Sequence, residues 1–292
     1  MIEIKNVTKC FDDFEALNDI NMRVKRGTIH GIIGENGAGK TTLIQAIVGI
    51  YTIDNGSIKI DGEEVYDNNK VKSEIGYVAD RNQYFKSYKI SELIEFFEMT
   101  YPSFSKESFD EYNKIMKLDI KRKVKQLSKG MQMRLSLILN LSLHPKVLVL
   151  DEPTSGLDAI VKKEILDIIL AEVLEKKMTV IISSHHISEL EKICDEVTII
   201  NHGRVAHQAT IDELKHDIKK LQVVFTKIPN DLKSNKEILN VENIGSVYYI
   251  VTDQYNDGFI CKLKDMGATL IEPIGITLEE IFIYTSQVRE EA

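Results

Sequence analysis

The chain has 292 residues, of which 43% are hydrophobic and 28% are charged. These fractions are those of an ordinary globular protein and exclude collagen-like, mucin-like and disordered chains. The formal net charge of -8 argues against a general binder of nucleic acid or of acidic membranes, because such proteins need a basic surface to displace counterions.

Up to about residue 215, short apolar segments alternate with longer amphipathic ones, which predicts an α/β domain with a covered sheet. Residues 1–7 alternate apolar and polar side chains as a strand does and lack the apolar run of a signal peptide. In chain order we expect strands at 29–33, 75–79, 146–150, 179–183 and 196–201, and helices at 41–48, 91–100, 106–116, 129–143, 159–175 and 187–194. A tight turn at 201–204 is expected to close the sheet, because Gly203 readily takes a positive φ.

The pattern changes after a lysine-rich helix expected at 211–220. Strands are expected at 221–226 and 245–252, and a helix near 257–266. We therefore expect two domains, an α/β domain over residues 1–215 and a small accessory α+β domain over residues 216–292.

Cysteine usage and hydropathy bear on the setting in which the chain works. Cys10, Cys194 and Cys261 are far apart and not in a metal-binding spacing, so we expect neither a disulfide framework nor a zinc site, and a reducing cytosol fits best. No apolar stretch approaches the roughly 18 to 20 residues that a membrane-spanning helix needs. A role at a membrane would therefore require a separate membrane subunit.

The segment GENGAGKTT at residues 34–42 follows an apolar strand and opens a helix, which is the context of a phosphate-binding P-loop. Glycines let backbone N–H groups turn inward, and the helix start offers unpaired N–H groups and a positive dipole end to phosphate. Lys40 is expected to reach the β and γ phosphates of a nucleotide, Thr41 to bind Mg²⁺, and Thr42 to donate to the α phosphate. The rest of the cradle is expected from Gly34, Asn36, Gly37, Ala38 and Gly39. The alternative is a chance glycine-rich turn.

The segment VLVLDEP at residues 147–153 predicts a buried strand that ends in two carboxylates, which a core strand would not carry without a task. Asp151 is expected to bind Mg²⁺ through its water shell. Glu152 is expected to polarise the attacking water as general base or orienter. The start of a solvated loop is the alternative.

Three further motifs complete an ordered set: LSKGMQ at residues 127–132, SGLD at 155–158 and SSH at 183–185. Together with the P-loop and the carboxylate pair, they resemble the ABC ATPase family in order and context over about residues 1–203. The resemblance implies an ABC-type P-loop NTPase with a helical signature subdomain, ATP and Mg²⁺ as cofactors, and ATP hydrolysis.

The resemblance also implies that two copies sandwich two ATP molecules, each held by the P-loop of one copy and the signature of the other. Ser128 and Gly130 lie at a predicted helix start, so a hydroxyl, an N–H group and the helix dipole can aim at a γ-phosphate. Asp158 is implied to couple the two sites, and His185 to hydrogen-bond the γ-phosphate; a histidine that caps a strand is the alternative. Phe11 lies where the family places an aromatic on adenine, with a core phenylalanine as an equal alternative.

Two motifs depart from the family pattern. The glutamine that contacts Mg²⁺ after the strand at 75–79 is replaced by Asp80. We expect Asp80 to act as a ligand of Mg²⁺, because carboxylate oxygen is a good ligand for this ion. Gln83 is the alternative. In the signature, Lys129 replaces the first glycine and Met131 the final glutamine. Because the P-loop lysine, both carboxylates and the histidine are present, we expect a homodimer with two working sites.

The first part of the chain and the ending LEEIF at residues 278–282 look like ATP-binding subunits of ABC-2-type exporters, including bacterial exporters of amphipathic or antimicrobial peptides such as the phenol-soluble modulins. The partner implied is a separate transmembrane permease in two copies, which would hold this chain at the cytoplasmic face of the cell membrane. Residues 82–97 are expected to receive a helix of that permease.

Two other functions fit the sequence less well. A soluble ABC-type ATPase acting on ribosomes or nucleic acid is disfavoured by the single ATPase domain, the lack of a coiled-coil insertion and the acidic charge. A purely regulatory binding module would need a decayed ATPase centre, and the presence of Glu152 argues against it.

Overall fold

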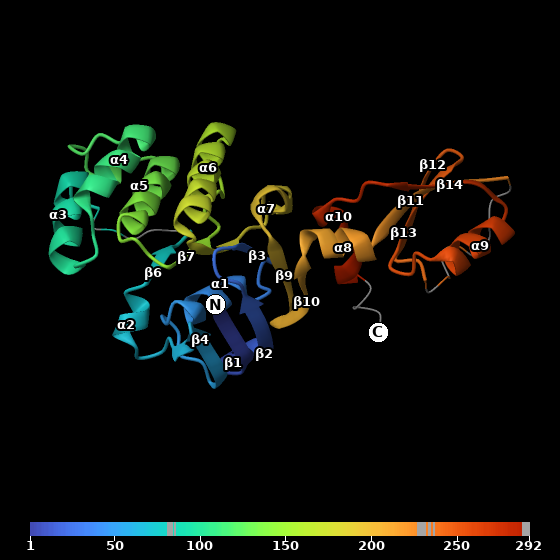
Figure 1. The fold of residues 1–292 in the computed structure, drawn as a ribbon, viewed down its shortest axis with the longest axis horizontal. Coiled ribbons are helices and arrows are strands. Elements are labelled where there is room, and N and C mark those ends of the chain that lie inside the picture. The colour runs from blue at the N-terminus through green and yellow to red at the C-terminus, as the bar shows by residue number, and fades with distance from the viewer. Residues whose placement is uncertain (81–83, 85, 227–231, 233–234, 236, 288–292) are drawn as a thin grey trace. The chain divides into compact units, whose positions relative to one another are not determined.

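The computed structural model describes residues 1–80, 84, 86–226, 232, 235 and 237–287. It divides into two compact units (Figure 1). Unit 1 comprises Met1–His186 and Ile193–Gln208, and unit 2 comprises Ile187–Lys192 and Ala209–Ala292. The expectation that residues 1–215 and 216–292 form separate domains stays a prediction.

A six-stranded sheet with the order β10-β9-β3-β8-β7-β6 forms the centre of unit 1. Strand β3 runs parallel to β8 and β9, and β7 runs parallel to β6 and β8. The bounds are β3 (Ile29–Ile33), β6 (Ile75–Val78), β7 (Val147–Asp151), β8 (Thr179–Ser183), β9 (Glu196–Asn201) and β10 (Arg204–Thr210). Strands β3, β7 and β8 are buried along their whole length, which is why they read as continuous apolar runs in the sequence.

A second sheet in unit 1 is antiparallel and has the order β2-β1-β4-β5. Its strands are β1 (Ile2–Phe11), β2 (Phe14–Val24), β4 (Asn55–Ile60) and β5 (Glu63–Glu64). Apolar side chains of β1, β2, β4 and helix α1 (Lys40–Ile47) form one core with Val149 of β7 and Ile181 of β8. This core fixes the helix that begins at the P-loop against the central sheet.

Helices complete unit 1. They are α2 (Asn69–Lys72), α3 (Ile90–Thr100), α4 (Lys106–Met116), α5 (Lys129–Leu141) and α6 (Ala159–Lys176), with a short 3-10 helix at Val124–Gln126. Figure 1 shows α3, α4 and α5 grouped together, and α5 packs against both α4 and β6. This group places the start of α5 near the end of β6.

Unit 2 contains a four-stranded antiparallel sheet with the order β12-β13-β11-β14. Its elements are α7 (Ile187–Ile193), α8 (Ile211–Asp217), β11 (Lys219–Phe225), β12 (Asn240–Ile244), β13 (Val247–Thr252), α9 (Asp257–Asp265), β14 (Ala268–Ile274) and α10 (Leu278–Gln287). Phe259 and Leu263 of α9 are buried against Leu221 and Val223 of β11. Because β11 lies between β13 and β14 and is antiparallel to both, the connection through α9 is a split β-α-β unit.

The α/β fold class is confirmed, and each of the five strands expected in the central sheet is present. The turn at 201–204 is also present, with His202 and Gly203 both at positive φ. The helix expected at 211–220 is too long, because α8 ends at Asp217 and β11 begins at Lys219. From there Leu221, Val223 and Phe225 are buried at every second residue, which is the period of a strand. The strand expected at 245–252 begins only at Val247.

The structure bears on the cysteines and on membrane-spanning helices. Cys10, Cys194 and Cys261 are free thiols. Within the part of the chain that the structure describes, no helix is both long enough and apolar enough to span a bilayer.

Candidate active site

The P-loop, the carboxylate pair, His185 and Asp80 meet at one edge of the central sheet. Strand β3 ends at Ile33 before the P-loop, β7 ends at Asp151, β8 ends at Ser183 shortly before His185, and β6 ends shortly before Asp80. These four strands are parallel neighbours, so their carboxyl ends share an edge, where ligands of open α/β sheets bind. A cavity of about 490 Å³ opens there. It is lined by Phe14, Ala16, Asn36, Gly37, Gly39, Lys40, Thr41, Thr42, Asp80, Glu152, Ser155 and His185.

The P-loop backbone has a conformation that requires glycine. Gly39 has a φ of +105°, and a Cβ added there would lie 2.7 Å from the carbonyl oxygen of Ala16. A Cβ on Gly34 would lie 2.5 Å from the carbonyl oxygen of Ile200. Gly39 caps α1 without a side-chain hydrogen bond, so the first N–H groups of that helix stay available to an anion. Gly34 therefore shapes the loop without lining the cavity, and Ala38 does not line the cavity either.

Lys40 lies almost buried beneath the loop that precedes it, with 7% of its surface exposed. Its Nζ donates to the carbonyl oxygens of Gly34 at 2.7 Å and Glu35 at 3.0 Å. Burial lowers the pKa of the Lys40 ammonium, while the charges of Glu152 and Asp151 oppose that shift. The ammonium is therefore held inside the P-loop, next to the cavity in which phosphates would lie.

Asp151 is buried and receives two hydroxyl groups on the same oxygen. Ser183 Oγ donates to Asp151 Oδ1 at 2.7 Å, and Thr41 Oγ1 donates to it at 3.4 Å. Burial raises the pKa of Asp151 against the effect of these hydrogen bonds, and the charges of Glu152 and Asp80 raise it further. A cation at this position would relieve the crowding of negative charge.

The donor set fits Mg²⁺ only if other ligands complete it. Among the residues that the structure describes, no group of three His, Cys, Asp or Glu side chains is arranged to hold a metal. One hydroxyl and one carboxylate, from Thr41 and Asp151, suit a magnesium ion held mainly by substrate phosphates and water. The Mg²⁺ assignments of both residues stay predictions.

Glu152 and His185 are joined directly at the cavity wall. His185 Nδ1 lies 2.5 Å from Glu152 Oε2, and the His185 backbone N–H donates to the same oxygen at 3.3 Å. Glu152 itself has a φ of +51°, which is uncommon for a residue with a side chain. Its N–H donates to the carbonyl oxygen and the hydroxyl of Ser183 at 3.2 and 3.0 Å, which holds this backbone in place. The Glu152 carboxylate is thereby fixed facing the P-loop cavity.

The signature residues line a different cavity, of about 500 Å³. Its lining is Ser128, Lys129, Gly130, Met131, Arg134, Gly156, Leu157, Asp158, Ile160 and Val161. Ser128 Oγ accepts from the N–H of Met131 at 3.3 Å and so caps α5. Asp158 caps α6, since its Oδ1 accepts from the N–H groups of Ile160 and Val161 at 3.1 and 3.0 Å. The structure thus does not bring Ser128, Gly130 or Asp158 to the P-loop cavity of the same chain.

The aromatic residue that lines the P-loop cavity is Phe14, which sequence reasoning missed. Phe11 stands opposite Phe14 in the β1–β2 ladder, with 38% of its surface exposed, so it is not a core residue. Its ring meets that of Tyr51 edge-on, 5.1 Å between centroids. The adenine contact of Phe11 stays a prediction, and Phe14 joins it as a candidate. The signal available in the sequence was that Phe14 lies across a two-residue turn from Phe11.

Asp80 lines the P-loop cavity, where a ligand of Mg²⁺ would have to lie. Its Oδ1 also lies 3.1 Å from the Nζ of Lys129 at the start of α5. Gln83, the alternative ligand, lies outside the described residues. The Mg²⁺ role of Asp80 stays a prediction.

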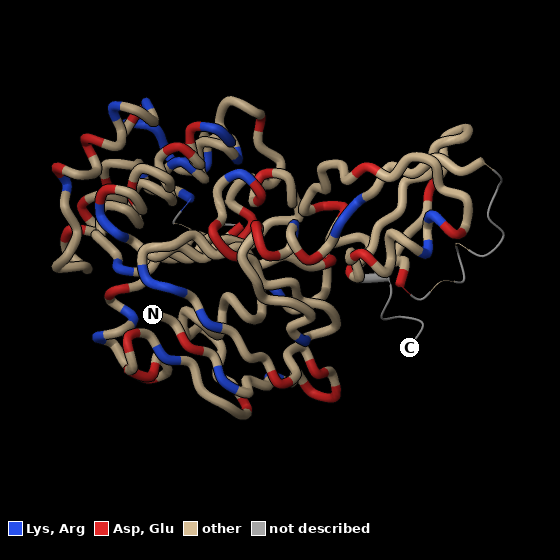
Figure 2. The backbone as a smooth tube through the Cα atoms, turned by 45° about the vertical axis from the view of Figure 1, so that its right-hand side comes forward, with Lys and Arg blue, Asp and Glu red and all other residues tan. Residues whose placement is uncertain are grey.

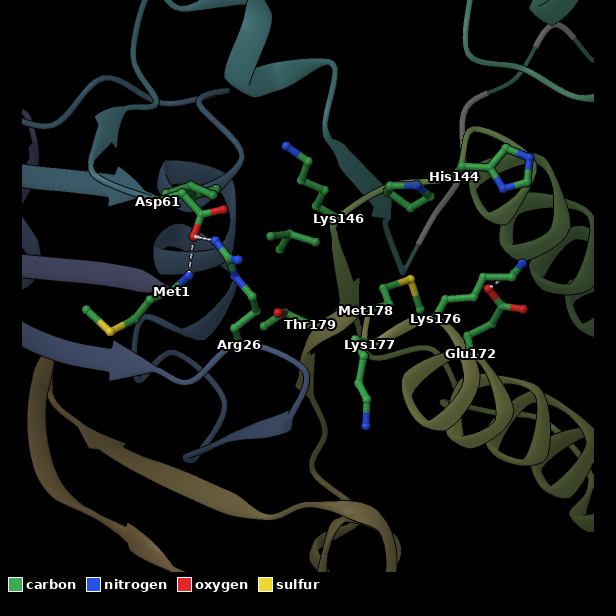
Figure 3. A pocket seen from close by; sticks show the side chains of 13 residues that line it. Met1, Arg26, Asp61, His144, Lys146, Glu172, Lys176, Lys177, Met178 and Thr179 are labelled. Atoms are coloured by element: carbon green, nitrogen blue, oxygen red, sulfur yellow. Dashed lines mark hydrogen bonds and ion pairs between the residues drawn. The ribbon is translucent and has the colours of Figure 1, made fainter.

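A third cavity, of about 390 Å³, lies at the opposite ends of the strands, where Thr179 begins β8. It is bordered by four cationic side chains: Arg26, Lys146, Lys176 and Lys177. Arg26 is paired with Asp61 at 2.6 Å. Figure 3 shows the ammonium groups of Lys146 and Lys177 pointing away from one another. These cations do not converge on a common point, so the cavity lacks the geometry of an anion site.

Comparison with known proteins agrees with this site. A family model described as "ABC transporter" matches residues 17–155. The ABC transporter ATP-binding protein YtrB of Bacillus subtilis (strain 168) is 28% identical over 97% of both chains. The bacitracin transport ATP-binding protein BcrA of Bacillus licheniformis is 33% identical over 75% of this chain and 73% of its own. The methionine import ATP-binding protein MetN of Clostridium tetani is 31% identical over 79% and 77%.

Solved structures show the same fold. A dimeric structure of the ATP-binding cassette MJ0796, in a post-hydrolysis state bound to ADP and Pi, superposes with a TM-score of 0.65 at 24% identity. The match covers 72% of this chain and 99% of that one. The fold and the edge-of-sheet site define a P-loop ATPase. The chain belongs to the family of ATP-binding subunits of ABC transporters.

Proposed function

We propose that this chain powers an exporter as an ATP-dependent homodimer bound to a separate permease. The observation that supports it best is the separation of two half-sites in one chain. The P-loop cavity holds Lys40, Glu152 and His185, while Ser128 and Gly130 line another cavity. A second copy, placed head to tail, would bring its signature to the first copy's phosphates.

In this proposal Glu152 polarises the water that attacks the γ-phosphate. His185 hydrogen-bonds the γ-phosphate, and its contact with Glu152 holds that carboxylate in position. Lys40 leaves the carbonyl oxygens of its own loop to contact the β and γ phosphates. ATP stabilises the closed pair of chains because each γ-phosphate contacts both copies. Hydrolysis removes the γ-phosphate contacts that stabilise the closed pair, and the copies separate.

Mg²⁺ would be held by Thr41 and Asp151 together with the phosphates. It would supply positive charge against the charge that develops during phosphoryl transfer. The buried Asp151 carboxylate, already fixed by the Ser183 hydroxyl, is preorganised for this task.

A surface for the permease is supported by exposed apolar side chains on and after α3. Phe96, Met99 and Tyr101 are 39, 88 and 40% exposed. Such a group of large apolar side chains on a water-exposed helix suits a partner helix. Residues 82, 83 and 85 of the expected groove (82–97) lie outside the described residues.

Export of amphipathic or antimicrobial peptides is the direction and cargo we propose. Support comes from the likeness to BcrA, whose name assigns it to bacitracin transport, and from the LEEIF segment, which opens α10. MetN, by contrast, is named for import. Deletion of the gene should raise the sensitivity of its host to added amphipathic peptides and the amount retained inside cells. Unchanged sensitivity, with loss of uptake of a nutrient instead, would overturn the proposed direction.

Dimerisation can be measured by light scattering of the purified 33.3 kDa chain. The Glu152→Gln variant should double in mass with Mg·ATP and remain a monomer with Mg·ADP. Ser128→Asp is a matched variant, because Asp keeps the α5 cap but sets a negative charge against the incoming γ-phosphate. It should bind ATP and stay monomeric. A Glu152→Gln chain that is monomeric with saturating ATP would contradict the proposal, as would a Ser128→Asp variant that dimerises equally well.

Action on ribosomes or nucleic acid has less support. Along the described backbone, Lys and Arg positions are interspersed with Asp and Glu positions (Figure 2). A chain with interspersed charges and a net charge of -8 does not favour the counterion release on which nucleic-acid binding depends.

A further inference from the structure

Two residues that depart from the family pattern form an ion pair with each other. Asp80 follows β6 and lines the P-loop cavity, and Lys129 is the first residue of α5 and lines the signature cavity. Lys129 Nζ lies 3.1 Å from Asp80 Oδ1. The pair therefore connects the rims of the two half-sites within one chain.

Lys129 occupies an electrostatically unfavourable place. A helix start carries partial positive charge, which disfavours a cation, and the first turn of α5 contains no acidic residue of its own. Asp80 supplies the missing negative charge from a different element. The ammonium also passes over the backbone of Gly156, 3.6 Å from the position of a Cβ there.

The pair is exposed enough to open easily. The side chains of Lys129 and Asp80 are 47 and 37% exposed, so water competes with their attraction and the pair stabilises the fold only weakly. A divalent cation close to Asp151 would attract the Asp80 carboxylate more strongly than one solvated ammonium does.

We propose that Lys129 is a positioning residue that holds Asp80 at the rim of the P-loop cavity and releases it when a nucleotide with Mg²⁺ fills that cavity. The inference rests on the proposed nucleotide site. In this proposal Asp80 pairs with the Lys129 ammonium before binding and with the cation after it.

The test measures nucleotide affinity with and without the metal. The probe is a fluorescent ADP, chosen because ADP does not drive the proposed dimer, and its Kd is measured in Mg²⁺ and in EDTA. The chains compared are the wild type, Lys129→Gln, Asp80→Asn and the double variant, with Lys125→Gln as a control. Lys125 is an exposed lysine four residues earlier, so its loss changes net charge equally without removing the pair.

Lys129→Gln should bind Mg·ADP about two- to fivefold more tightly than the wild type, because binding no longer opens an exposed ion pair. In EDTA, and in the Asp80→Asn background, the same substitution should have no such effect. The inference is overturned if Lys129→Gln behaves like Lys125→Gln in Mg²⁺, or if the tightening persists without Asp80. A wild type that fails to bind Mg·ADP would overturn the proposed nucleotide site as well, so the two failures are distinguishable.

Discussion

At the scale of single residues, we propose that ATP hydrolysis depends on Glu152, whose carboxylate contacts His185. Glu152→Gln keeps the side-chain volume and a hydrogen-bonding group for His185 but removes the proposed base. ATP turnover should fall by about 10²- to 10⁴-fold, the usual contribution of a general base, while ATP binding stays near that of the wild type. Steady-state phosphate release and equilibrium binding of a fluorescent ATP measure the two quantities.

A matched control for that variant is Glu35→Gln. Glu35 lies in the P-loop, but its side chain does not line the cavity; only its carbonyl oxygen contacts Lys40. This variant should keep most of the turnover. A Glu152→Gln chain that retains more than a tenth of the wild-type rate would show that another group acts as the base.

Several of these residues could be identified from sequence, because their signals are local. The spacing of the P-loop fixes Lys40 and Thr41, and a buried strand that ends in Asp151 and Glu152 has few structural explanations. The pair of Asp80 with Lys129 could not be foreseen. It depends on how closely α5 approaches the end of β6, which no spacing within either segment specifies.

At the scale of elements, β3 carries a buried histidine next to the P-loop. His30 is fully buried, its Nε2 lies 2.7 Å from Thr198 Oγ1, and its Nδ1 has no hydrogen-bond partner among the described residues. Glu196 Oε2 lies 3.8 Å from that Nδ1. Burial, with a smaller contribution from the charge of Lys25, lowers the pKa of His30 from 6.5 to about 4. The folded chain therefore accommodates the neutral ring.

This histidine should make the stability of the fold depend on pH. The unfolded chain takes up the proton near pH 6.5 and the folded chain only near pH 4, so the stabilisation is complete above pH 6.5 and is lost as the pH falls through that window. Between pH 7.5 and pH 5, His30 should cost about 2 kcal/mol of unfolding free energy. Urea unfolding followed by circular dichroism should show this loss in the wild type and a smaller one in His30→Gln.

Thr198→Val is the control for that measurement, because it removes the hydrogen-bond partner of Nε2 and keeps the titrating ring. Its unfolding free energy should decrease at both pH values, with the pH dependence retained. Equal pH dependence in the wild type and in His30→Gln would mean that His30 is not the group responsible.

The elements differ in how well their sequences reveal them. Strands β3, β8 and β9 have the expected bounds, because a buried parallel strand is a continuous apolar run between polar turns. The end of α8 was placed too late, because the lysines at 219 and 220 favour a helix in isolation while the alternate burial that begins at Leu221 depends on the sheet. Strand β12, largely exposed, has no such pattern and was missed.

At the scale of the whole molecule, the P-loop residues and the signature residues line two separate cavities, so the proposed active centre needs a second copy of the chain. The fold and the half-sites follow from the order of the motifs along the sequence. The proposed permease partner does not follow from that order, because the exposure of Phe96, Met99 and Tyr101 becomes visible only when α3 is folded. The cargo path would lie in that partner.

The most direct measurement is purification of this protein from its native membranes in mild detergent, with mass spectrometry of whatever polypeptide comes with it. We predict a stoichiometric protein with several membrane spans, lost when Met99 is replaced by Asp on the exposed part of α3 and retained when the exposed Leu174 of α6 is replaced in the same way. Recovery only from the soluble fraction, together with ribosomes or nucleic acid, would leave the ATPase in place and contradict the transporter.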